Sequence, residues 1–288
     1  MMAVFEKELR AYFHGVTGFV FSAFLLLFVG IYMMVGCLYG LSPHFEYVLG
    51  STTFIFLIGI PLLTMRSVAE EKRLKTDQLL YALPLSMTRV VLGKYLALLV
   101  VLALPMLVMG LYPLLLMSFG EVNLRAAYAS LFGFFMLGAC LSAIGLFISS
   151  ITENQVTAAV LCLVTMLVLY FMSGLASYIS STAAASVTAF AVLIVVLSVI
   201  LWLLTRNTVV SVGVMAVCMA GLFFWYGMDS AAFAGLFPAM MTHLSVFDRF
   251  FTIVDGVFDL TAIVYYASIA GVFLFLSVQA MEKRRWSA

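Results

Sequence analysis

The chain has 288 residues, of which 65% are hydrophobic and 9% are charged, and its formal net charge at pH 7 is +1. A water-soluble domain carries roughly 25% charged residues, so the composition excludes that class and predicts an all-α, polytopic helical membrane protein. The nearly balanced charge argues against a nucleic-acid partner. The four cysteines stand singly in apolar runs, which favours packing roles over disulfides or a zinc site.

The N-terminal segment 4–16 has an amphipathic pattern. Its apolar residues recur at helical spacing, whereas Glu6, Lys7, Arg10 and His14 occupy the other face. This pattern predicts a helix that lies in the membrane interface. A simple membrane anchor and a lever that moves with the first span are both open readings of this helix. The apolar residues are Val4, Phe5, Leu9, Tyr12, Phe13 and Val16.

Eight apolar stretches follow that could cross a membrane, for which a helix needs about 20 residues. The stretches are 18–40, 50–65, 90–118, 127–149, 156–178, 187–205, 208–228 and 261–281. The second is short and contains Pro61, and the third contains Pro105 and Pro113, so kinks are expected in the third. The stretches leave no room for a soluble domain, and we expect one transmembrane domain over residues 1–288.

The basic residues set the expected orientation, because cytoplasmic loops are enriched in Lys and Arg. With the N-terminus in the cytoplasm, twelve basic residues lie inside and only Arg125 and Arg249 lie outside. Both termini are then cytoplasmic. Residues 183–228 form a hairpin or a re-entrant pair, and the segment 229–260 lies outside the cytoplasm and has room for one or two short helices. The inside set is Lys7, Arg10, Arg66, Lys72, Arg73, Lys75, Arg89, Lys94, Arg206, Lys283, Arg284 and Arg285.

The loop 66–89 carries the densest charge, since nine charged residues fall between Arg66 and Lys94. We expect residues 66–75 to continue the second helix, and Thr76 and Asp77 to start a new short helix. Its apolar stripe is Leu79, Leu80 and Leu83, and Pro84 ends it. Such a stripe is costly in water unless it is covered. Either the membrane and the chain's own spans cover it, or it docks a cytoplasmic partner.

Catalytic motifs are missing from the sequence. It contains no GxxxxGK[ST] phosphate-binding loop, no HExxH and no GxSxG. Ionisable residues are scarce within the spans, which disfavours an ion-coupled transporter. Small residues such as Gly133, Gly138, Ser142 and Gly145 suit close helix packing. We therefore expect no catalytic, cofactor or metal site in this chain.

Several segments resemble the ABC-2 family of ABC-transporter permeases. FEKELRAYFHGVTGFVF resembles the family's interfacial elbow helix and first span, and MRSVAEEKRLKTDQLLYALPLSMTRVVLGKYLA its cytoplasmic loop. ISSITENQVTAAV resembles the turn between its fourth and fifth spans, and residues 243–286 resemble the gliding-motility-type subgroup in particular. The resemblance covers residues 1–178 and 243–286. The family commonly has six spans, so residues 183–228 look like an added hairpin.

The resemblance implies the permease subunit of an exporter in the bacterial inner membrane. It implies two partners, a second permease subunit and cytoplasmic ATPase subunits, and the ATPase would bind the ATP and magnesium. The alternative is a membrane scaffold that anchors a cytoplasmic complex without pumping, and a secondary transporter or intramembrane enzyme is less favoured. The implied ATPase-docking residues are Glu70, Glu71, Lys72, Arg73, Thr76, Asp77, Leu79, Leu80, Leu83 and Pro84, and the implied interfacial-helix residues are Phe5, Glu6, Leu9, Arg10, Tyr12 and Phe13.

Overall fold

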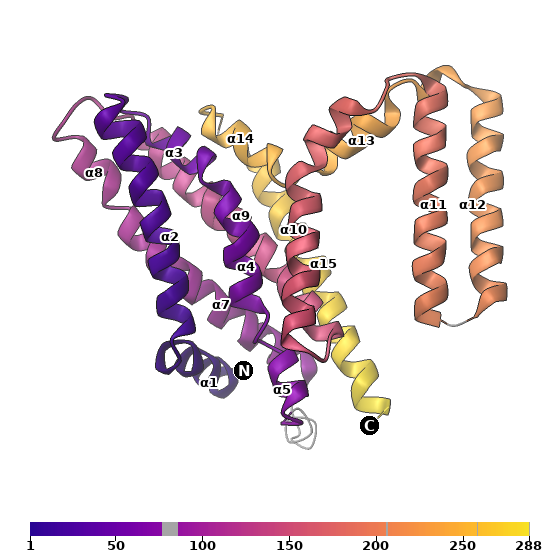
Figure 1. Ribbon diagram of the computed structural model, residues 1–288, viewed down its shortest axis with the longest axis horizontal. Coiled ribbons are helices and arrows are strands. Elements are labelled where there is room, and N and C mark those ends of the chain that lie inside the picture. The colour runs from indigo at the N-terminus through magenta and orange to yellow at the C-terminus, as the bar shows by residue number, and fades with distance from the viewer. Residues whose placement is uncertain (77–85, 206, 258, 288) are drawn as a thin grey trace. The chain divides into compact units, whose positions relative to one another are not determined.

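The computed structural model describes residues 1–76, 86–205, 207–257 and 259–287, and the regular structure in these residues is entirely helical (Figure 1). Seven helical segments within the described residues are long and apolar enough to cross a membrane. The chain is therefore a polytopic helical membrane protein, as predicted. The segments are Thr17–Tyr39, Phe45–Arg73, Met87–Leu116, Leu124–Ile151, Gln155–Tyr178, Thr208–Met228 and Leu260–Arg285.

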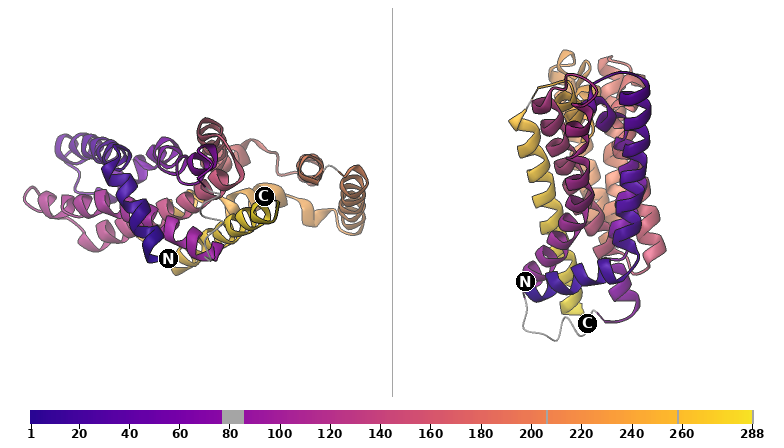
Figure 2. Two further views of the ribbon diagram at one scale, coloured as in Figure 1. Left: turned by 90° about the horizontal axis from the view of Figure 1, so that it is seen from below. Right: turned by 90° about the vertical axis from the view of Figure 1, so that its left-hand side faces the viewer.

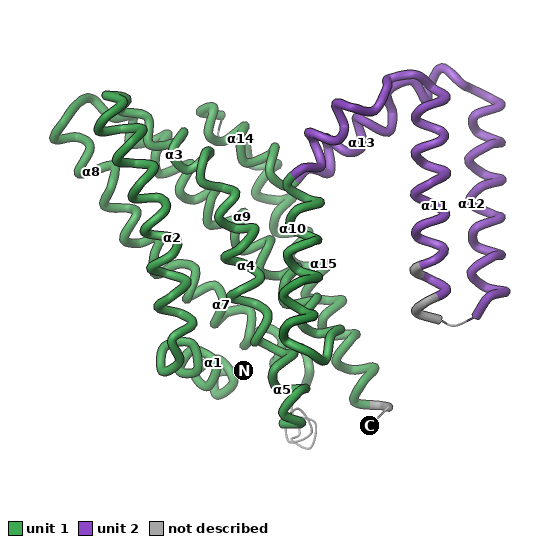
Figure 3. Tube along the Cα trace, viewed as in Figure 1, with its two compact units in different colours: residues 1–170, 246–288 green, residues 171–245 purple. Residues whose placement is uncertain are grey.

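Seven of the eight predicted spans coincide with these segments. The remaining prediction, 187–205, corresponds to α11 (Ala183–Thr205), whose apolar part among the described residues, 183–199, is shorter than a full span. The chain forms two compact units, one of residues 1–170 and 246–288 and one of residues 171–245 (Figure 3). The expected hairpin lies within the second unit. That residues 1–288 act as one permease domain stays a prediction.

Unit 1 begins with α1 (Met2–His14), which lies across the end of α2 (Thr17–Met33) (Figures 1 and 2). The chain bends between them at Gly15 and Val16. The amphipathic pattern thus predicts a helix here, but it places both the start and the end of the helix two residues too late. The first span continues past α2 as a π-helical segment, η1 (Met34–Tyr39).

The second span is built from four pieces rather than one helix. These are α3 (Phe45–Ser51), η2 (Thr53–Ile55), α4 (Phe56–Thr64) and α5 (Ala69–Arg73). Residues 65–68 form a turn between α4 and α5. The expected continuous helix over 66–75 is therefore wrong, and the side chains that hold the turn are described below.

The third span consists of α7 (Met87–Met109) and α8 (Tyr112–Leu116). The helix is interrupted after Met109, and Pro113 stands in the first turn of α8, where its missing N–H costs no hydrogen bond. The predicted kink is confirmed there, whereas Pro105 lies inside α7.

The remaining helices of unit 1 are α9, α10, α14 and α15. They span Leu124–Ile151, Gln155–Tyr178, Asp248–Val254 and Leu260–Ser287. The last residues of α10, from Phe171, are assigned to unit 2. In Figure 1 the two termini and α5 lie at one end of unit 1, and α3, α8 and α14 lie at the other.

The core of unit 1 is centred on α9, which packs against α4, α7, α14 and α15. The rings of Phe56 and Phe134 stack with centroids 4.4 Å apart. A Cβ atom at Gly138 would lie 2.9 Å from the side chain of Leu102, and one at Gly145 would overlap Thr64. The predicted close packing through small residues is confirmed. Because lipid tails are as apolar as these side chains, this contact stabilises the bundle by van der Waals packing.

Unit 2 contains α11, α12 (Thr208–Met228), η3 (Ala231–Phe233) and α13 (Leu236–Leu244). Helices α11 and α12 run side by side, and the Ser211 hydroxyl donates a 2.6 Å hydrogen bond to the Ser198 carbonyl. Phe233 is buried among aromatic rings of α11 and α12. Together with α14 in unit 1, α13 and η3 confirm short helices within 229–260.

Candidate functional site

The turn at residues 65–68 removes backbone hydrogen bonds from the second span, and side chains from three other helices replace them. The Ser149 hydroxyl of α9 accepts from the N–H groups of Val68 (3.1 Å) and Ala69 (3.0 Å). The Tyr12 hydroxyl of α1 donates to the Leu63 carbonyl at 3.1 Å. A buried backbone group without a partner is costly, so these side chains stabilise the break and determine where α5 begins.

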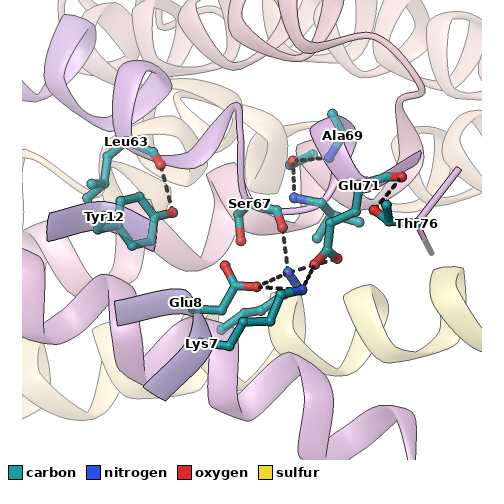
Figure 4. Close-up of polar contacts among 11 residues, drawn as sticks. Lys7, Glu8, Tyr12, Leu63, Ser67, Ala69, Glu71 and Thr76 are labelled. Carbon is teal, nitrogen blue, oxygen red and sulfur yellow. Dashed lines mark hydrogen bonds and ion pairs between the residues drawn. The ribbon is translucent and has the colours of Figure 1, made fainter. Parts of the chain in front are cut away.

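Lys94 of α7 supplies the third attachment. Figure 4 shows three residues that contact it, Glu8, Ser67 and Glu71, close together. The Lys94 side chain is fully buried, and its Nζ donates to Glu8 Oε1 (2.7 Å) and to the Ser67 carbonyl (2.6 Å). Nζ also lies 2.9 Å from Glu71 Oε2. An ammonium group has three protons, and each has an acceptor here.

A second lysine completes a group of four that we call the Lys94 cluster: Lys7, Glu8, Glu71 and Lys94. Lys7 Nζ lies 2.7 Å from Glu71 Oε1 and 4.0 Å from Glu8 Oε1. The cluster contains two cations and two anions, so its formal charge is zero. Buried charges are tolerated when they are paired and hydrogen-bonded, and this arrangement joins α1, α5 and α7.

Other polar contacts extend from the loop to neighbouring elements. Lys72 is buried and donates to the Ser150 carbonyl near the end of α9. Arg66 forms a two-pronged ion pair with Glu70, with N–O distances of 2.8 and 3.0 Å, and also donates to the Thr17 hydroxyl at 2.9 Å. Together with Lys7 and Glu71, these contacts bond the loop to α1, to the start of α2 and to the end of α9.

A cleft of about 280 Å³ lies between α1 and the loop. The cations and carboxylates of its lining are largely paired with each other, so it offers no concentrated charge of one sign to a ligand. Within the part of the chain that the structure describes, no group of three potential ligand residues could hold a metal ion. The lining residues are Lys7, Glu8, Ala11, Tyr12, Thr17, Arg66, Ser67, Glu70, Glu71 and Leu74.

The residues predicted for the interfacial helix divide between two faces of α1. Tyr12 is buried, Phe5, Leu9 and Phe13 are half-buried, and Glu6 and Arg10 are exposed. Burial raises the pKa of Tyr12 well above its usual range, so its hydroxyl remains a neutral donor. The predicted apolar face therefore packs on the protein, chiefly on α7.

The residues predicted for ATPase docking are only partly described. Arg73 is exposed and Glu70 is half-buried in its pair with Arg66, whereas Glu71 and Lys72 point inward, to Lys94 and to the Ser150 carbonyl. The Thr76 hydroxyl donates back to the Glu71 carbonyl at 3.2 Å. The expected helix after Thr76 falls outside the described residues, as do its members Asp77, Leu79, Leu80, Leu83 and Pro84.

Sequence reasoning missed the roles of Glu8, Ser149 and Lys94. Glu8 shares a face with Val4 and Tyr12 at a spacing of four residues, which is the available signal that it points into the protein. Lys94 lies within an apolar helical run, directly after Gly93. Ser149 carries no local signal, because its partners belong to the distant turn.

Comparison with known proteins identifies the family. The family model described as ABC-2 family transporter protein matches residues 2–187, which is more than half of the chain. No curated protein and no solved structure matched the chain. The matched region includes α1, the charged loop and five of the membrane-spanning segments. The chain therefore belongs to the ABC-2 transporter family.

Proposed function

We propose that the chain is the permease subunit of an ABC-2 type exporter in the bacterial inner membrane, powered by a separate cytoplasmic ATPase. The family membership supports this, and so does the sequence, which lacks a phosphate-binding loop. Its Gly93-Lys94 pair lacks both the preceding glycine and the following Ser or Thr of that motif. ATP and magnesium would bind to the ATPase and not to this chain.

The attachment of the loop to the membrane-spanning helices is the main structural support for this function. A surface that receives motion from an ATPase must transmit it, and a loosely tethered loop would absorb it. Tyr12, Lys94 and Ser149 bond directly to the backbone of residues 63–69. Motion of α5 would thereby reach α1, α7 and α9.

The docking surface would be formed by residues that come after α5 in the sequence. Leu79, Leu80 and Leu83 would contact the ATPase, with the exposed side of α5, including Arg73, as a polar flank. A second permease subunit, identical or homologous, would complete the transporter. The resemblance of residues 243–286 to gliding-motility-type permeases supports that subgroup.

The test is co-expression with an ATPase encoded beside the gene, followed by reconstitution in lipid nanodiscs. We expect the tagged permease to capture the ATPase and to stimulate ATP hydrolysis. Leu80→Asp should abolish both. Leu41→Asp is the matched control, because Leu41 is 89% exposed and lies in the connection between the first and second spans; it should leave capture and hydrolysis unchanged.

The outcomes separate the candidate functions. An ATPase that is captured without stimulation, and without ATP-driven transport, would favour the scaffold. If the wild-type permease captures no such ATPase, or Leu80→Asp leaves capture and stimulation intact, the docking assignment is refuted.

A further inference from the structure

The acceptors of Lys94 come from two segments that are far apart in the sequence. Glu8 belongs to α1, whereas Ser67 and Glu71 flank the start of α5. Lys94 itself belongs to α7. One buried nitrogen therefore bonds to α1 and to the loop from a third helix, and the geometry fixes all three distances between 2.6 and 2.9 Å.

The direct ion pair between α1 and α5 is weaker than the connection through Lys94. Lys7 reaches Glu71 at 2.7 Å, but the Lys7 side chain is 60% exposed. Exposed ion pairs are screened by water and contribute little. Within the cluster, the fully buried Lys94 side chain thus carries most of the linkage between α1 and the loop.

The packing beside Lys94 fits this role. A Cβ atom at Gly93 would lie 3.2 Å from the Met1 carbonyl oxygen and 3.2 Å from Val4 Cβ. The start of α1 therefore rests directly on the α7 backbone. Glu8 lies one turn further along α1 from Val4, on the same face, which places its carboxylate at Lys94.

We propose that Lys94 is a positioning residue that makes α1, α5 and the first turns of α7 move as one body. Displacement of the loop then displaces α1 and, through the bend at Gly15 and Val16, the start of the first span. The inference rests on the proposed function only for the source of that displacement. The linkage is a property of this chain alone.

The test measures amide hydrogen exchange of the purified permease in phosphatidylcholine–phosphatidylglycerol nanodiscs. Lys94→Met keeps the length of the side chain and removes the ammonium. We expect exchange in α1 and in residues 65–73 to rise at least tenfold, with α14 at the other end of unit 1 unchanged. Glu8→Gln, which keeps Lys94 bonded to Glu71, should raise exchange in the same two segments by a smaller factor.

Lys75→Met is the matched control, because Lys75 is exposed on the same loop; its exchange pattern should match the wild type. Unchanged exchange of α1 in the Lys94 variant overturns the proposal. An equal rise in α1 and α14 also overturns it, because Lys94 would then stabilise the fold generally. If the Lys94 variant does not fold, Glu8→Gln decides: faster exchange in α1 supports the linkage and wild-type exchange overturns it.

A second arm adds the ATPase. Nucleotide binding should change α1 exchange in the wild type, whereas Lys94→Met should retain ATPase capture and lose that change. A nucleotide response of α1 that persists in the Lys94 variant overturns the linkage. If the wild-type permease captures no ATPase, the proposed function fails while the first arm still tests the linkage.

Discussion

The Lys94 cluster makes a quantitative prediction for a double-mutant cycle between Glu8 and Lys94. Lys94→Met leaves two largely buried carboxylates with only Lys7 as counter-charge, and leaves the Ser67 carbonyl without its donor. Removing one partner of a buried pair costs about 3–5 kcal/mol. Glu8→Gln costs less, about 1.5–3 kcal/mol, because it replaces a charged acceptor of Lys94 by a neutral amide oxygen and leaves the contacts with Ser67 and Glu71 in place.

The two changes should not be additive. In the Lys94→Met background, Glu8→Gln removes a buried carboxylate that has lost its main partner, so the second change costs less than it does in the wild type. We expect a coupling free energy of about 1–3 kcal/mol. The assay is reversible unfolding in mixed detergent micelles, with the four free energies of unfolding measured at one lipid-to-detergent ratio.

Additivity of the two free-energy changes within about 0.5 kcal/mol would refute the reasoning, since residues that share no interaction behave in that way. Lys75→Met again serves as the control. Its side chain is exposed, and the change should alter the free energy of unfolding by no more than about 0.5 kcal/mol.

Three further predictions use the same unfolding assay. Ser149→Ala leaves the Val68 and Ala69 N–H groups without an acceptor and should cost about 1–3 kcal/mol, most of which Ser149→Thr should restore. Gly145→Val forces α9 away from Thr64 and should cost about 1–3 kcal/mol or more, with aggregation visible on size-exclusion chromatography. Arg66→Gln removes a partly exposed ion pair and should cost about 0–1 kcal/mol.

Each of these has an outcome that contradicts it. A stable Ser149→Ala variant would mean that water replaces the hydroxyl at the turn. Wild-type stability of Gly145→Val would show that α9 does not pack closely on α4. A loss of stability for Arg66→Gln as large as that for Lys94→Met would contradict the expectation that exposed ion pairs contribute less than buried ones.

The spans were predictable because their signal is local. Length and composition alone define an apolar helix of about 20 residues, and Pro113 marks the break in the third span through its missing N–H. The break at 65–68 has no such mark, since no glycine or proline stands in that stretch and the residues around it favour a helix. It is stabilised by Tyr12, Lys94 and Ser149, which are remote in the sequence.

The burial of Glu8 in α1 was not predicted, for a related reason. Amphipathic patterns assign charged residues to water, but Glu8 lies on the buried face with Val4 and Tyr12. Its burial depends on a lysine 86 positions away. A helical pattern contains no information about such a partner, so the charge of the loop was predictable and the pairing of that charge was not.

The chemistry of the cluster favours a role in position over a net gain in stability. A buried ion pair can often be replaced by well-packed apolar residues at little cost or with a gain, and apolar side chains are abundant in this chain. Apolar contacts, however, are non-directional and allow neighbouring helices to slide. Three hydrogen bonds to one ammonium fix the direction of each acceptor. Lys94→Met would fill the space, but it would remove the bonds that fix Glu8 of α1 relative to Ser67 and Glu71 of the loop.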